Sequence, residues 1–188
     1  MPGRRSVLAG ALPALLLALL APVVTAPPAR AQTETAAPAH APPCPPHLFV
    51  IARSKNANIV AYDANRDPAG EFVKSTPVVA YWLLNGEGGA REELGFIDRT
   101  RAYGFDTVPG HTPGTYKLTF KAGKKRRLTI HMLNGCPVAT ARIGGHDGIL
   151  RRMFIQAKET SRLPKVEYVE FFGEDLKDGG PLYEKILP

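Results

Sequence analysis

The sequence predicts a mainly β protein: an antiparallel meander of about eight strands curled into a barrel or half-barrel. Alternation of apolar and polar residues with a period of two dominates residues 47–188, whereas helical periodicity appears only once. Turn signals containing Gly, Pro or Asn separate the alternating runs. Short strands in succession favour a meander, and curling into a closed or half-closed barrel removes its free edges.

The clearest pair of strands is a hairpin within residues 116–132. Tyr116, Leu118 and Phe120 alternate with polar neighbours, and after a turn at 122–124 the alternation resumes at Leu128. One face of this hairpin is therefore expected to face solvent. The other predicted strands are 48–53, 58–63, 77–84, 137–143, 149–158 and 165–172.

One helix is predicted, between the third and fourth strands, over residues 89–104. Leu94 and Ile97 mark an apolar stripe and Gly104 provides a stop signal. We expect this helix to cover the barrel mouth or to pack on the sheet. Either position would place its charged residues near one rim.

Three regions are predicted along the chain. Residues 1–31 are typical of a signal peptide, with Arg4 and Arg5 before an apolar run and small residues at 29–31. The start, RRSVLAG, also resembles a twin-arginine export motif, and the general secretory route remains open. Residues 32–46 form a Pro/Ala-rich tether, and 47–188 form a single β-rich domain. The protein is therefore expected to be periplasmic or secreted, with no transmembrane segment in its mature form.

The two cysteines, Cys44 and Cys136, are candidates for a disulfide. Export places them in an oxidising compartment, where a bridge would pin the tether to the domain. The alternative is two free thiols, with Cys136 buried as a small apolar residue.

A basic cluster is predicted at the tip of the hairpin, in the segment KAGKKRR (121–127), which Arg142, Arg151 and Arg152 could join. Export makes nucleic acid an unsuitable partner, and aromatic residues are not interleaved with these cations. An anionic envelope polymer or a lipid head group fits the cluster better. The alternative is a soluble tip that lysines protect from edge pairing.

The polar segment RSKNAN (53–58) joins two apolar runs and is the first candidate site. An Asn-rich turn explains its asparagines, because Asn tolerates left-handed backbone angles. A turn does not require the cations Arg53 and Lys55, which suit a small anion or an ion pair with Glu92 or its acidic neighbours.

Established catalytic and metal motifs are absent from the sequence. The mature chain has no Gly-x-Ser-x-Gly elbow and no His-Glu-x-x-His, and His111, His131 and His146 are not at ligand spacing. We therefore predict neither a catalytic residue, nor a metal, nor a cofactor.

Several of these segments resemble a known family. The marks are RSKNAN (53–58), Tyr81-Trp82, Glu92-Glu93-Leu94 and Ala102-Tyr103-Gly104. They resemble the uncharacterised bacterial secreted family known as domain-of-unknown-function family 4833. The resemblance covers nearly all of residues 48–188 and excludes the tether. It implies one exported domain and no particular activity.

The preferred functional hypothesis is an exported, non-enzymatic binding module for a small or anionic ligand. An eight-stranded barrel can hold one small ligand. Aromatic residues could line such a cavity or could simply form the core; they are Tyr81, Trp82, Tyr116, Phe120, Phe154 and Tyr168. One alternative is a cell-envelope hydrolase or lyase with a polar rim of Arg53, Lys55, Glu92 and His111; another is a structural or interaction protein of the envelope. The ligand-binding candidates are Arg53, Lys55, Asn56, Asn58, Trp82, Glu92, Arg99, Tyr103 and His111.

Overall fold

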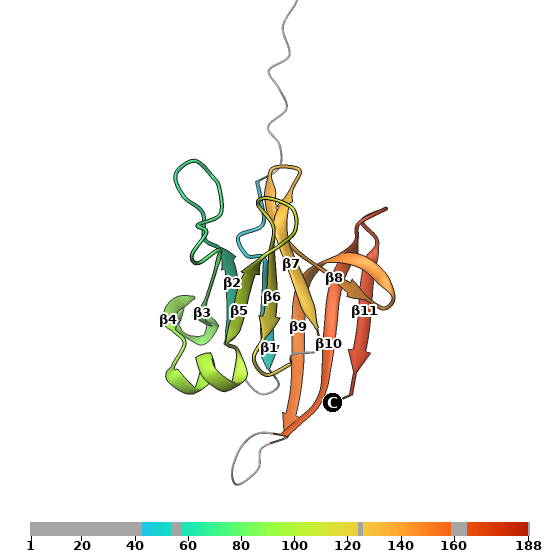
Figure 1. The fold of residues 1–188 in the computed structure, drawn as a ribbon. Helices are drawn as coiled ribbons and strands as arrows, with labels where there is room; N and C mark the ends of the chain where they lie inside the picture. Colours follow the sequence, from blue (N-terminus) through green and yellow to red (C-terminus); the bar gives the residue numbers. More distant parts are fainter. Residues whose placement is uncertain (1–42, 54–57, 124–125, 159–164, 188) are drawn as a thin grey trace, which may run out of the picture. The chain divides into compact units, whose positions relative to one another are not determined.

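The computed structural model describes residues 43–53, 58–123, 126–158 and 165–187. The predicted signal peptide, most of the predicted tether, Lys55 and Asn56 lie outside these residues. Eleven strands form one sheet (Figure 1). They are β1 (Phe49–Arg53), β2 (Ile59–Ala64), β3 (Val78–Leu84), β4 (Ala90–Glu93), β5 (Phe105–Pro109), β6 (Tyr116–Phe120), β7 (Arg127–Leu133), β8 (Cys136–Ile143), β9 (His146–Lys158), β10 (Lys165–Asp175) and β11 (Pro181–Ile186).

The sheet branches at β9, its longest strand. The first half of β9 pairs with β8, and its second half pairs with β1 along the same edge. The other edge of β9 pairs with β10, which pairs with β11. Beyond β8 lie β7, β6 and β5, and beyond β1 lie β2, β3 and β4. We call these branches the β5–β8 arm and the β1–β4 arm.

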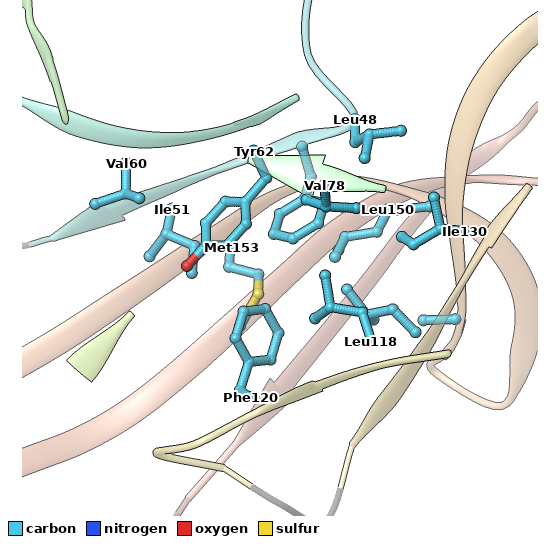
Figure 2. Close-up of a cluster of buried hydrophobic side chains, with 14 of the residues drawn as sticks. Leu48, Ile51, Val60, Tyr62, Val78, Leu118, Phe120, Ile130, Leu150 and Met153 are labelled. Atoms are coloured by element: carbon cyan, nitrogen blue, oxygen red, sulfur yellow. The ribbon is translucent and has the colours of Figure 1, made fainter. Parts of the chain in front are cut away.

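The two arms curl toward each other and enclose the core, so the sheet is a half-barrel. Phe49 of β1 stacks on Tyr62 of β2 with their rings 4.4 Å apart. Phe120 of the opposite arm meets Tyr62 edge-on at 5.8 Å. Figure 2 shows the rings of Tyr62 and Phe120 among the aliphatic side chains that fill the interior. No polar or charged residue among the described ones is buried in this core.

The predicted fold class, mainly β and curled into a half-barrel, is confirmed. The predicted strands correspond to β1, β2, β3, β6, β7, β8, β9 and β10. Three further strands were not predicted: β4, β5 and β11. In addition, β1 and β9 pair in parallel, a pairing that a simple meander does not contain.

The predicted helix over 89–104 is wrong. Residues 90–93 form β4, preceded by a short 3-10 turn at Asn85–Glu87. After β4 the chain makes a single π-helical turn at Asp98–Ala102. Of the two residues in the expected stripe, Leu94 is buried but Ile97 is 64% exposed, so the segment has too little apolar surface to pack a helix. None of the helical turns in the described part of the chain is long and apolar enough to cross a membrane.

The structure pairs Cys44 with Cys136, in agreement with the predicted disulfide, and their sulfur atoms are 2.10 Å apart. Cys136 begins β8, whereas Cys44 lies just before β1. The bond therefore joins the chain at its entry into the domain to the β5–β8 arm.

Candidate functional site

An open cleft lies at one end of the β1–β4 arm, where β3 and β4 meet the turn that follows β4. Its volume is about 270 Å³. We call it the Trp82 cleft. Its lining residues are Asn58, Trp82, Leu84, Glu92, Glu93, Gly95 and Asp98.

The β3–β4 hairpin brings the indole and a carboxylate to the same place. Trp82 and Glu92 lie directly opposite each other in the antiparallel register, so their side chains share one face of the sheet. The connection between the strands uses Gly88 and Gly89, with φ of 71° and 82°, a backbone conformation that glycine adopts without strain.

The indole ring of Trp82 is held on two sides. Its Nε1 donates a hydrogen bond to Oδ2 of Asp98 at 3.1 Å. The ring of Tyr103 meets it edge-on, with the ring centroids 5.1 Å apart. Burial raises the pKa of Tyr103, and the charge of Arg53 together with a hydrogen bond from it opposes that shift. Arg53 is therefore a partner of Tyr103, whose ring packs against the indole.

The turn that carries Asp98 is fixed to the core. The backbone carbonyl of Asp98 accepts hydrogen bonds from the amides of Tyr103 at 2.8 Å and Gly104 at 3.0 Å. The buried Tyr62 hydroxyl donates to the Tyr103 carbonyl at 2.7 Å. A Cβ atom at position 104 would overlap the carbonyl oxygen of Arg99, so this turn requires glycine there.

The cleft has an acidic lining, and two exposed apolar residues follow Gly95 in the chain. Three of its lining residues are acidic, namely Glu92, Glu93 and Asp98, and none of the described lining residues is a cation. Arg99 approaches Glu93 at 3.8 Å, but both side chains are largely exposed, so this ion pair contributes little. Phe96, which follows the lining residue Gly95, is 77% exposed, and the next residue, Ile97, is 64% exposed.

The predicted site residues are only partly brought together. Asn58, Trp82 and Glu92 line the cleft, Arg53 and Tyr103 lie behind it, and Arg99 belongs to the turn. Lys55 and Asn56 lie outside the described residues.

The candidate His111 lies elsewhere. The chain leaves the cleft at Gly104 and runs along β5, which carries it about 17 Å away before the loop that contains His111. The rim of Arg53, Lys55, Glu92 and His111 expected for a hydrolase is therefore not assembled by the described residues.

A second polar cluster was missed in the sequence, and it centres on Asp63. Oδ1 of Asp63 lies 2.6 Å from Nδ1 of His47, and Oδ2 accepts a hydrogen bond from the Tyr81 hydroxyl at 2.7 Å. The Arg91 guanidinium lies over the Tyr81 ring at 4.4 Å and 3.8 Å from Oδ2. The pKa of Tyr81 is raised to about 12, by burial and then by the hydrogen bond to Asp63. The available signal was a single acid at the end of a strand with a tyrosine on the neighbouring strand.

A third cluster ties the basic hairpin to β11. Arg126 binds Glu184 at 2.6 Å and lies over the Phe171 ring at 4.1 Å. The hydrogen bond from Arg126 lowers the pKa of Glu184. Arg126 is therefore part of a half-buried ion pair, and not of an exposed basic tip.

The described residues contain no group of three or more His, Cys, Asp or Glu side chains placed to hold a metal ion.

Comparison with known proteins identifies the family of the chain but assigns no activity to it. The family model Domain of unknown function (DUF4833) matches residues 49–185, so the chain belongs to that family. The predicted family membership is confirmed. No curated protein and no solved structure matches the chain.

Proposed function

We propose that this member of the DUF4833 family is an exported, non-enzymatic binding module whose Trp82 cleft takes a small organic cation with a substituted ammonium group. One observation carries the proposal. The cleft combines an indole with the carboxylates of Glu92 and Asp98, and none of its described lining residues is a cation. From the sequence the ligand was left open, as small or anionic, because Arg53 and Lys55 suit either an anion or an ion pair within the protein.

An ammonium group is attracted to both parts of this lining. The electron-rich face of an indole binds a cation, with an energy of about 0.5 to 2 kcal/mol depending on desolvation. The carboxylates of Glu92 and Asp98 add charge complementarity around the same cleft. Since Asp98 and Tyr103 already hold the ring, binding does not require the indole to be reoriented.

The size and the rim of the cleft restrict the ligand further. A volume of about 270 Å³ suits a molecule of few heavy atoms. The exposed side chains of Phe96 and Ile97 beside the cleft would contact an apolar part of the ligand. We therefore favour a compact ammonium compound over a sugar or a dicarboxylate.

The binding site is this cleft and not the interior of the half-barrel. Tyr116 and Phe120, which a ligand-holding barrel would use to line a cavity, belong to the packed core. A filled interior is also what a purely structural protein would have. The cleft is the feature that favours binding over a structural role.

The chain has one tryptophan, so its fluorescence reports directly on the cleft. We expect choline to change the emission saturably, whereas its uncharged isostere 3,3-dimethylbutan-1-ol and acetate leave it unchanged. Glu92→Gln should weaken choline binding roughly tenfold. A response to the isostere equal to that for choline, or none to choline at millimolar concentrations, would contradict the proposal.

A further inference from the structure

The outer face of β9, β10 and β11, on the side away from the core, has a different composition from an ordinary solvent-exposed sheet face. The strand register defines this face. Tyr183, Phe172 and Arg152 lie opposite one another across the three strands. The next row on the same side is Lys185, Glu170 and Phe154. We call this surface the aromatic face.

Four aromatic rings lie on this face, outside the buried core. Phe172 and Tyr183 have their centroids 5.4 Å apart, and Phe154 and Tyr168 are 6.4 Å apart. Tyr183 is 52% exposed and the other three are partly exposed. Exposed rings that are grouped in this way are typical of a binding surface.

Cations are interleaved with the rings. Nζ of Lys185 lies 3.5 Å from the centroid of Tyr168. The guanidinium of Arg152 lies between two rings, 5.5 Å from that of Phe172 and 5.8 Å from that of Phe154. These contacts hold the charged groups in place on the sheet surface.

At the far end of the same face, two lysines are paired directly. Lys158 of β9 lies opposite Lys165 of β10, and both are exposed. Like charges directly opposite each other on neighbouring strands destabilise a sheet. An anion bound between the two lysines would relieve this repulsion.

The cations of this face are not neutralised within the described part of the chain. Arg152, Lys158, Lys165 and Lys185 form no ion pair with a described residue, whereas Arg126 and Arg151 do. Of the nearby acids, Glu170 accepts a hydrogen bond from the Tyr183 hydroxyl, and Glu174 binds Arg151. The face thus carries excess positive charge.

We infer that the aromatic face binds an acidic polysaccharide. From Arg152 to Lys158 the face extends about 20 Å along β9, which accommodates several sugar units. Partly exposed Phe and Tyr rings contact the apolar C–H faces of sugars, while Arg and Lys bind the carboxylates. This surface is separate from the Trp82 cleft and does not depend on the function proposed for that cleft.

The geometry favours a polysaccharide over other anionic partners. Single-stranded nucleic acid needs open ring faces on which bases stack. Here the rings are tilted against one another by 51° and 43°, and cations lie over three of them. A membrane surface would need apolar side chains that protrude, whereas three of the four rings are partly buried against the sheet.

The outer face of β6 and β7 provides a matched control. It presents polar residues such as Thr119, Thr129 and the exposed cation Arg127, and none of the aromatic rings. Arg127→Gln therefore removes the same charge as Arg152→Gln from a surface without aromatic residues.

The test is a titration of the purified full-length chain with polygalacturonate at low salt, with neutral dextran, oligo(dT) and anionic phospholipid vesicles in parallel. We expect saturable binding of polygalacturonate that weakens steeply with salt. Arg152→Gln and Tyr183→Ala should each weaken it roughly tenfold, and Arg127→Gln by less than about twofold. Lys158→Gln, at an exposed site, provides a further variant if Tyr183→Ala does not fold.

Three results would overturn the inference. The first is no binding of polygalacturonate at low salt. The second is an equal loss of binding in Arg127→Gln and Arg152→Gln. The third is tighter binding of oligo(dT) or of the vesicles than of polygalacturonate, which would assign the face to another class of partner.

Discussion

Two aspartates of the β1–β4 arm and its following turn have the same kind of partner but different surroundings. Asp63 accepts a hydrogen bond from the Tyr81 hydroxyl, and Asp98 accepts one from the indole nitrogen of Trp82. Both oxygens of Asp63 are engaged, and its side chain is only 15% exposed. The carboxylate of Asp98 instead forms part of the wall of an open cleft.

The difference follows from strand geometry. Tyr81 and Trp82 are neighbours in β3, so their side chains point to opposite faces of the sheet. On one face a carboxylate is enclosed by His47, Tyr81 and Arg91 and stabilises the fold. On the other, a similar pair remains accessible to a ligand. The same hydrogen-bonding chemistry is therefore structural at Asp63 and, in our proposal, functional at Asp98.

The largest effect is expected from removing the disulfide, which fixes the chain next to His47. The bond joins residues 92 positions apart, and a loop of this size corresponds to about 4 to 5 kcal/mol of stability. Replacing both cysteines by alanine should lower the free energy of unfolding in urea by that order, without changing choline affinity in the protein that remains folded. A fall in choline affinity would mean that the Asp63 cluster, which contains His47, is coupled to the Trp82 cleft.

The next largest effect is expected from Asp63→Ala. The substitution leaves the buried Tyr81 hydroxyl and the His47 ring without their acceptor. We expect a loss of about 2 to 4 kcal/mol in the free energy of unfolding. Asp106→Ala, at a largely exposed position of β5, is the matched control. A loss under about 0.5 kcal/mol in the free energy of unfolding of Asp63→Ala would show that Asp63 does not stabilise the fold.

A smaller effect is expected from alkaline pH. The pKa of Tyr81 is raised from 10.0 to about 12 in the folded protein. Because the folded state holds this proton more tightly, its contribution to stability is complete below pH 10 and is lost as pH rises toward about 12. Urea unfolding across this range should show a decline that is reduced in Tyr81→Phe. An equal decline in the two proteins would assign the alkaline instability to other groups.

Much of the fold could be predicted because alternation of apolar and polar residues is a local signal. The strands of the β6–β7 hairpin follow it closely. It fails for β4, where Arg91, Glu92 and Glu93 are all exposed, and for β5, which is short and ends in proline. The β1–β9 pairing joins segments about 100 residues apart, and nothing local in the sequence indicates it.

The site was also predictable only in part, because only its local features could be recognised in the sequence. Trp82, Glu92 and Asn58 stood out by residue type and position, and the structure places them around one cleft. Asp98 was not chosen, because it lay within a segment interpreted as a helix. His47 and Asp63 are 16 positions apart, and only the pairing of β1 with β2 brings them together. The sign of the charge in the cleft also depends on which residues line it, and these residues can be identified only from the folded structure.

The most direct test of the account is isothermal titration of choline into Asp98→Asn and Asp63→Asn, each compared with the wild-type protein at a temperature where all three are folded. An asparagine side chain keeps an oxygen that can accept the Trp82 hydrogen bond, so the Asp98→Asn substitution removes mainly the charge. We expect a roughly tenfold loss of affinity in Asp98→Asn and an unchanged affinity in Asp63→Asn. Equal affinities in the two variants would contradict the assignment of Asp98 to binding and Asp63 to the fold.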